Sequence, residues 1–170
     1  MTIIDALLAE LDQEAETTRR VLERIPETHL SWRPHPKSMS LGQLALHVAT
    51  VPGTVAEIAA MDVLPSPPAF TQAEAATASE LVPSLTESVA RARRVLGGFD
   101  DAGMAATWRM QSAGKDIMAM PRAAFIRAVL LNHWYHHRGQ LLVYLRLLDR
   151  PVPSVYGPTA DENPFAAAMA

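Results

Sequence analysis

The amino-acid sequence predicts an all-α fold, a four-helix bundle with short irregular connecting segments. The 13 prolines leave four long proline-free stretches, residues 1–25, 37–51, 84–120 and 122–150. Proline inside a helix removes a hydrogen bond and clashes with the preceding turn, so these stretches are where helices can form. Apolar residues within them recur at steps of three and four, the period of a helix with one buried face. The sequence shows no sustained run of alternating β-branched residues and no internal repeat, which also favours a helical bundle.

The first predicted helix covers about residues 2–25 and ends at Pro26. Its buried face consists of apolar residues spaced by three and four: Ile4, Leu7, Leu8, Leu11, Ala15, Val21, Leu22 and Ile25. The second helix begins at Ser40, because its hydroxyl and Gln43 can form a capping box. The apolar pattern resumes after Pro52-Gly53, so we expect this pair to kink the second helix without ending it.

Two further helices are expected in the second half of the chain. The third starts near Ser79 and stops at Gly97, where a left-handed C-terminal residue costs least. The fourth starts at Pro121, a residue that suits the first helical position, and continues until Pro151. Residues 99–120 are ambiguous and predict either a short strand-like segment or an irregular crossing.

Composition excludes several classes of protein. At 170 residues the chain is the size of one domain, residues 1–170, with a proline-rich C-terminal segment over 151–170. The 15 basic and 18 acidic residues give a net charge of −3, so we expect no nucleic-acid partner. The absence of cysteine excludes a disulfide framework, a thiolate zinc site and a cysteine nucleophile. Neither a secretory signal nor an uninterrupted membrane span is visible, so we expect a cytoplasmic protein without a membrane partner.

Candidate chemistry is concentrated in three histidines. His133 and His137 are four residues apart, which places them about 40° apart around a helix and one turn from each other. Two imidazoles at this spacing can bind one ion at about 2.0–2.1 Å from each nitrogen. His47 lies between Leu44 and Val51 on the apolar stripe of the second helix, where a bare ionisable group is costly to bury. The three histidines therefore predict a metal site with positions open to water or substrate, which is the catalytic pattern.

The kind of metal ion stays open at this point. Three imidazole nitrogens suit zinc, nickel, copper or iron, and zinc is the first choice because an imidazole trio with bound water is a familiar zinc arrangement. Trp134, Tyr135 and His136 separate the paired histidines. The glutamate of the HExxH metalloprotease motif is thus missing, which excludes that class. His136 is expected at the edge of the ligand face, and His29 and His35 are expected to be solvated.

Three segments carry a resemblance to a known family. They are Trp32 to His47 (WRPHPKSMSLGQLALH), His133 to Arg146 (HWYHHRGQLLVYLR), and PVP at 151–153 with YGP at 156–158. In these segments the chain resembles the DinB family, including its YfiT-like branch of metal-dependent proteins, which is unrelated to the DNA polymerase of similar name. Their order and spacing fit over nearly the whole chain, and the HHRGQL run is the most specific piece.

The resemblance implies a bundle of the DinB/YfiT-like type, often a homodimer, with one divalent ion held by three histidines. The ligands carry over onto His47, His133 and His137, and none is missing. Related proteins include transferases that use low-molecular-weight thiols and isomerases that depend on mycothiol. Family membership therefore predicts a metal ion better than it predicts a substrate, and the catalytic residues stay unidentified.

The first compatible function is transfer of a low-molecular-weight thiol. The ion would lower the pKa of the thiol and hold the thiolate as a nucleophile. Gln140 and Tyr144, on the ligand face, would either orient this small-molecule substrate or satisfy hydrogen bonds in the core.

Two other functions compete with it. In the second, the ion activates water for hydrolysis, and Asp161 or Glu162 supplies the base if the C-terminal segment folds over the site; otherwise these residues belong to a solvated tail. In the third, the ion stabilises a non-catalytic, stress-associated interaction module, in which Arg138 and Arg146 form surface or dimer ion pairs.

Overall fold

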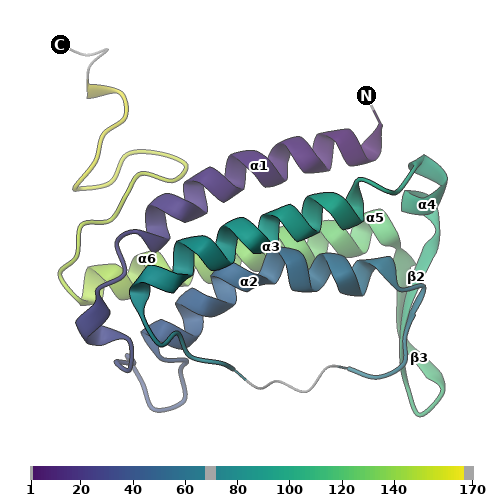
Figure 1. Ribbon diagram of the computed structural model, residues 1–170, viewed down its shortest axis with the longest axis horizontal. Coiled ribbons are helices and arrows are strands. Elements are labelled where there is room, and N and C mark those ends of the chain that lie inside the picture. Colours follow the sequence, from purple (N-terminus) through teal and green to yellow (C-terminus); the bar gives the residue numbers. More distant parts are fainter. Residues whose placement is uncertain (1, 68–71, 167–170) are drawn as a thin grey trace.

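The computed structural model describes residues 2–67 and 72–166. Four long helices run side by side and make up most of the molecule (Figure 1). They are α1 (Ile3–Leu22), α2 (Leu41–Ala60), α3 (Leu81–Leu96) and α6 (His133–Leu147). Their buried apolar side chains form one core cluster. The predicted helical architecture is confirmed in this main part of the fold, and no described helix is long and apolar enough to cross a membrane.

The helix ends mostly follow the capping signals of the sequence. Thr2 and Asp5 form a reciprocal capping box at the start of α1, and Ser40 and Gln43 form the predicted one at the start of α2. The predicted left-handed residue after α3 is wrong, because Gly97 has a φ of −64°. Its N–H still donates to a carbonyl one turn earlier, so the backbone leaves the helix gradually and needs no left-handed residue there.

A small three-stranded sheet contradicts the all-α prediction. Its strands are β1 (Val63–Leu64), β2 (Thr107–Ser112) and β3 (Lys115–Pro121). β2 and β3 form an antiparallel hairpin, and β1 pairs with β2 in parallel. The turn residues Ala113 and Gly114 have φ values of 49° and 75°, as two-residue hairpin turns require. The ambiguous segment 99–120 thus holds most of the sheet, preceded by the short helix α4 (Asp101–Ala105).

The fourth predicted helix is continuous but not uniform. It begins with α5 (Arg122–Phe125), passes through the π-helical segment η3 (Ile126–Asn132) and continues as α6. A π-helical turn holds an extra residue, so it rotates the helix that follows. The buried residues of α6 are Trp134, Arg138, Leu141 and Leu145. The sequence places His133 and His137 on a face with apolar neighbours and so predicts that they point into the bundle, whereas both are half-buried and lie beside this stripe.

The remaining segments connect and cover the bundle. Two short 3-10 helices, η1 (Glu27–His29) and η2 (Ala78–Glu80), precede α2 and α3. The C-terminal segment, residues 151–166, turns back from the end of α6 and passes the C-terminal end of α1 (Figure 1). Arg20 of α1 holds it by donating to the Ser154 carbonyl oxygen at 3.1 Å.

Candidate metal centre

Two helices bring three histidine rings together. His47 comes from the first half of α2, His133 is the first residue of α6, and His137 lies one turn further along α6. Ring centroids are 5.2 Å apart for His47 and His133, 4.6 Å for His47 and His137, and 4.5 Å for His133 and His137. One nitrogen from each ring lies within 4.8 Å of the nitrogens from the other two, so the cluster can hold a metal ion.

The spacing between the nitrogens fits a metal ion. The Nε2 atoms of His47 and His133 are 3.4 Å apart. Two bonds of about 2.05 Å to one ion, at a tetrahedral angle, place their nitrogens about 3.4 Å apart. His137 offers its Nε2 atom as well, because its Nδ1 atom is hydrogen-bonded to the Gln140 side chain. The donor set is therefore three imidazole nitrogens.

The electrostatic environment keeps these rings neutral. Burial, followed by repulsion from His137 and His133, lowers the pKa of His47 to about 4. Burial is also the main reason why the pKa values of His133 and His137 lie below the ordinary histidine value. At pH 7 all three rings are neutral, and neutral imidazole is the form that binds a metal ion.

The cluster leaves room for a further ligand. All three histidines are only partly buried. In the described part of the chain, the cluster of possible metal ligands contains no carboxylate. Three protein ligands with solvent access are typical of catalytic zinc sites, whereas structural zinc sites have four.

Comparison with known proteins identifies the family. A sequence model of the DinB family matches residues 1–164. The chain belongs to the DinB family. It is 23% identical over 163 residues to the uncharacterized protein YrdA of Bacillus subtilis, an alignment that covers 94% of this chain and 91% of YrdA.

Solved structures of DinB-like proteins share the fold. One from Bacillus cereus has a TM-score of 0.70 and 22% sequence identity, and the match covers 89% of this chain and 97% of that one. The DinB-like protein YjoA of Bacillus subtilis has a TM-score of 0.64 and 16% identity, covering 93% of this chain and 99% of that one. The helical bundle of this chain is therefore a DinB-type fold.

Gln140 lies beside the histidine cluster and contacts one of its rings. Its Oε1 atom is 2.8 Å from Nδ1 of His137, and its Nε2 atom is 3.0 Å from Nε2 of His136. The exposed ring of His136 lies at the edge of the cluster, with its centroid 5.0 Å from that of His137. Tyr144 has another partner, because its hydroxyl donates to the Met39 carbonyl oxygen at 3.2 Å.

The other two histidines make local contacts away from the cluster. Nδ1 of His29 is 2.8 Å from the Thr28 hydroxyl, and Nδ1 of His35 accepts from the Lys37 N–H at 3.1 Å. His35 is exposed, as predicted, whereas His29 is partly buried.

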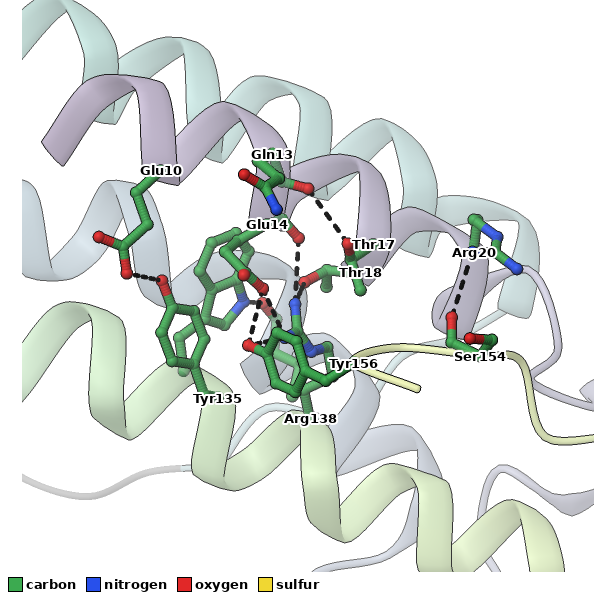
Figure 2. Close-up of polar contacts among 12 residues, drawn as sticks. Glu10, Gln13, Glu14, Thr17, Thr18, Arg20, Tyr135, Arg138, Ser154 and Tyr156 are labelled. Carbon is green, nitrogen blue, oxygen red and sulfur yellow. Dashed lines mark hydrogen bonds and ion pairs between the residues drawn. The ribbon is translucent and has the colours of Figure 1, made fainter. Parts of the chain in front are cut away.

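Arg138 is not on the surface, which corrects one of the expected roles. It is 1% exposed and forms an ion pair with Glu14 of α1 at 2.5 Å. Its Nη1 donates to the Thr18 hydroxyl at 3.0 Å and its Nη2 to the Tyr156 hydroxyl at 2.5 Å. The Tyr156 hydroxyl in turn donates to Glu14 at 3.0 Å, and Figure 2 shows these groups meeting between α1, α6 and the C-terminal segment. Because its polar atoms are paired, this buried ion pair is tolerated.

Sequence reasoning missed this polar cluster, although a signal was present. Leu7, Leu11, Glu14, Thr18 and Val21 are spaced by three and four, so Glu14 falls on the buried stripe of α1. A carboxylate at such a position needs a buried cation as its partner. Arg138 provides this cation one residue after His137, on another face of α6.

The acidic residues of the C-terminal segment accept hydrogen bonds from the backbone of this segment and pair with arginines of α6 and α1. Asp161 pairs with Arg146 and accepts from the Val152 N–H at 2.9 Å. Glu162 pairs with Arg20 and accepts from the Ser154 N–H at 2.9 Å. The pair of Arg146 and Asp161 is the surface ion pair that was one of the expectations. Both carboxylates have partners in the segment and are not in the histidine cluster.

Proposed function

We propose that this DinB-family chain binds one divalent metal ion through His47, His133 and His137, and that it transfers low-molecular-weight thiols to electrophilic small molecules. The observation that carries the proposal is the convergence of three neutral, half-buried imidazoles from two helices, with the His47 and His133 Nε2 atoms 3.4 Å apart. Zinc is the first choice of ion and nickel the second, since both accept nitrogen donors.

A thiol suits this donor set better than water does. Bound zinc lowers the pKa of a thiol and stabilises its thiolate, which is the nucleophilic form. A free thiol has a pKa of about 8.5 and bulk water one of about 15.7, so the thiol needs far less help to lose its proton. The cluster itself contains no carboxylate that could serve as the base for a water molecule.

In such a transfer the protein binds the ion and orients the thiol toward the electrophile. The sulfur forms a bond to the carbon of the electrophile, the bond from that carbon to its leaving group breaks, and the thiol proton leaves with the leaving group or to solvent. His47, His133 and His137 would hold the ion, and Gln140 fixes the ring of His137 through its Nδ1 atom. The half-buried position of the rings lets a small molecule reach the centre from solvent.

Hydrolysis is the weaker alternative, because Asp161 and Glu162 are engaged by Arg146 and Arg20. A non-catalytic, metal-stabilised, stress-associated module is the other alternative, and it shares the metal centre but predicts no turnover. The homodimer implied by the family resemblance stays a prediction, and light scattering of the purified protein tests it. The cytoplasmic location, expected because the sequence shows neither a secretory signal nor a membrane span, also stays a prediction.

A conjugation assay with the zinc-loaded protein tests the proposal. The thiols would be cysteine, coenzyme A, glutathione and mycothiol, with an aryl chloride or a bimane bromide as electrophile. We expect turnover with at least one thiol, loss of turnover in a chelator and in His137→Ala, and its retention in His35→Ala. Ester or amide hydrolysis that disappears with the chelator would favour the hydrolase instead. Zinc that raises the melting temperature without turnover in either assay would favour the non-catalytic module.

A further inference from the structure

The backbone of α2 contains a carbonyl group that the helix cannot satisfy. In an α-helix the N–H of residue 52 would donate to the carbonyl oxygen of Val48, but residue 52 is proline and has no N–H. Val48 is 0% exposed, so water cannot replace the missing donor. A buried carbonyl without a partner costs about 1–3 kcal/mol.

The donor comes from α6. The indole Nε1 of Trp134 donates to the Val48 carbonyl oxygen at 2.8 Å, in a buried position. Val48 follows His47 in α2, and Trp134 follows His133 in α6. The hydrogen bond and the contact between the two histidine rings are therefore made by adjacent residue pairs at one crossing point of the helices.

The α2 backbone next to Pro52 is also bound by α3. The N–H of Gly53 donates to the Ser88 hydroxyl of α3 at 2.8 Å, and that hydroxyl donates to the Thr50 carbonyl oxygen at 3.0 Å. A Cβ atom on Gly53 would lie 2.9 Å from the Ser88 carbonyl oxygen, so only glycine permits this close approach. The Pro52-Gly53 pair thus gives both neighbouring helices a point at which to bind the α2 backbone.

The positions of the rings are sensitive to the register of these helices. One residue of an α-helix corresponds to a rise of about 1.5 Å and a rotation of about 100°. Metal–nitrogen distances tolerate only about 0.2 Å of deviation. A slip of α6 along α2 by a fraction of one residue would therefore separate His47 from His133. A buried hydrogen bond to one particular carbonyl oxygen adds to the side-chain packing a contact that only one register satisfies, because a slip leaves that oxygen without a partner.

We propose that the hydrogen bond from Trp134 to the Val48 carbonyl, which Pro52 leaves free, sets the register of α6 against α2 and so brings His47 and His133 to metal-binding distance. Trp134 is a positioning residue in this account and does not contact the metal. The inference rests on the proposed metal centre and adds the device that aligns it.

A second tryptophan provides a matched control. Trp108 is 1% exposed, and its indole Nε1 donates to the Ile58 carbonyl oxygen at 3.1 Å. It therefore makes the same kind of bond to α2, but near the end of the helix and away from the histidines. The Ile58 carbonyl oxygen also accepts from the Met61 N–H at 3.2 Å, so loss of the Trp108 indole N–H should destabilise the fold less than loss of the Trp134 one. Only the loss at Trp134 should affect metal binding.

The test is zinc titration calorimetry combined with urea unfolding of the metal-free protein. Trp134→Phe should weaken zinc binding about tenfold or more. The zinc affinity of Trp108→Phe should stay within about threefold of the wild-type affinity. Adding Pro52→Ala to Trp134→Phe supplies a backbone N–H to the Val48 carbonyl. This double variant should regain unfolding free energy while zinc binding stays weak, and Pro52→Ala alone controls for the effect of removing the proline.

Hydrogen exchange in the unaltered protein tests the same coupling without a substitution. Zinc stabilises the whole fold and so slows exchange of both indoles through global unfolding, but it should slow the Trp134 indole N–H more than that of Trp108, because coupling between two sites is reciprocal. Wild-type zinc affinity in Trp134→Phe, or affinity that recovers together with stability in the double variant, overturns the positioning role. Equal effects of zinc on the two indoles also overturn it. A wild-type protein that takes up no divalent ion overturns the metal centre itself.

Discussion

The Nδ1 atom of His137 lies 2.8 Å from the side-chain oxygen of Gln140. An amide oxygen only accepts hydrogen bonds, so it holds the proton of this ring on Nδ1 and leaves Nε2 free to bind an ion. Metal-bound histidines commonly donate their other N–H to such an acceptor, which fixes the orientation of the ring.

Gln140→Ala should therefore weaken metal binding without unfolding the protein. We expect a loss of about 10- to 100-fold in zinc affinity, measured by calorimetry, with an unchanged helical circular dichroism signal. Gln140→Glu keeps the acceptor oxygen and should retain most of the affinity. His136→Ala removes the other partner of Gln140 and serves as the control. Full zinc affinity in Gln140→Ala would show that this contact does not orient the ligand.

The ion pair of Arg138 and Glu14 should matter for stability. Glu14→Ala leaves a buried guanidinium without its carboxylate, which costs about 3–5 kcal/mol of unfolding free energy. Arg146→Ala, at the exposed pair with Asp161, should cost less than about 1 kcal/mol. Urea unfolding of the two variants measures the difference. Similar losses in both would mean that the Arg138 pair is not desolvated in solution.

Tyr156→Phe should loosen the C-terminal segment. The Tyr156 hydroxyl accepts from Arg138 and donates to Glu14, so its removal leaves both buried partners with one hydrogen bond fewer. We expect the unfolding free energy to fall by about 1–2 kcal/mol and proteolytic cleavage within residues 151–166 to become faster. Zinc affinity should not change, because the hydroxyl contacts none of the three histidines. Cleavage at the wild-type rate would contradict a role of Tyr156 in holding the segment.

The stability of the metal-free protein should depend on pH through His47. Its pKa is about 4 in the folded chain and about 6.5 in an unfolded one, so the unfolded state binds more protons between these values. Stability from this ring is present above about pH 6.5 and is lost as the pH falls toward 4. When the pH falls from 7 to 5, the unfolding free energy of the wild type should decrease by on the order of 1 kcal/mol more than that of His47→Gln. This value allows for solvent screening of the half-exposed ring. Equal losses in chelator-treated samples would contradict the lowered pKa.

Periodicity predicted the long helices well and the short strands poorly. Apolar residues recur over five or six turns in α1 and α2, so the pattern there is repeated many times. β2 and β3 contain six and seven residues, and Trp108 is their only buried side chain among the described residues. An alternating pattern with one buried member cannot be told from an irregular segment. The turn at Ala113-Gly114 was the better signal, since positive φ favours glycine.

The histidine cluster could be anticipated because its chemistry is local. A spacing of four residues places His133 and His137 on one face of a helix whatever the rest of the fold does. The role of Arg138 depends on a residue 124 positions away in the chain, and the π-helical turn that rotates α6 leaves no compositional mark. Glu14 on the buried stripe of α1 signals that a buried cation must meet it, but that this cation is Arg138 follows from tertiary packing, as does the π-helical turn.

Metal content is the measurement that tests the central claim most directly. After loading with zinc and removal of excess ion, elemental analysis should find about one zinc per wild-type chain and close to none in His47→Ala, His133→Ala and His137→Ala. The neighbouring His136→Ala should keep its zinc, and all four variants should keep their helical signal. Full zinc content in any of the first three variants, or loss of zinc in His136→Ala but not in His137→Ala, would contradict the assignment of the three ligands.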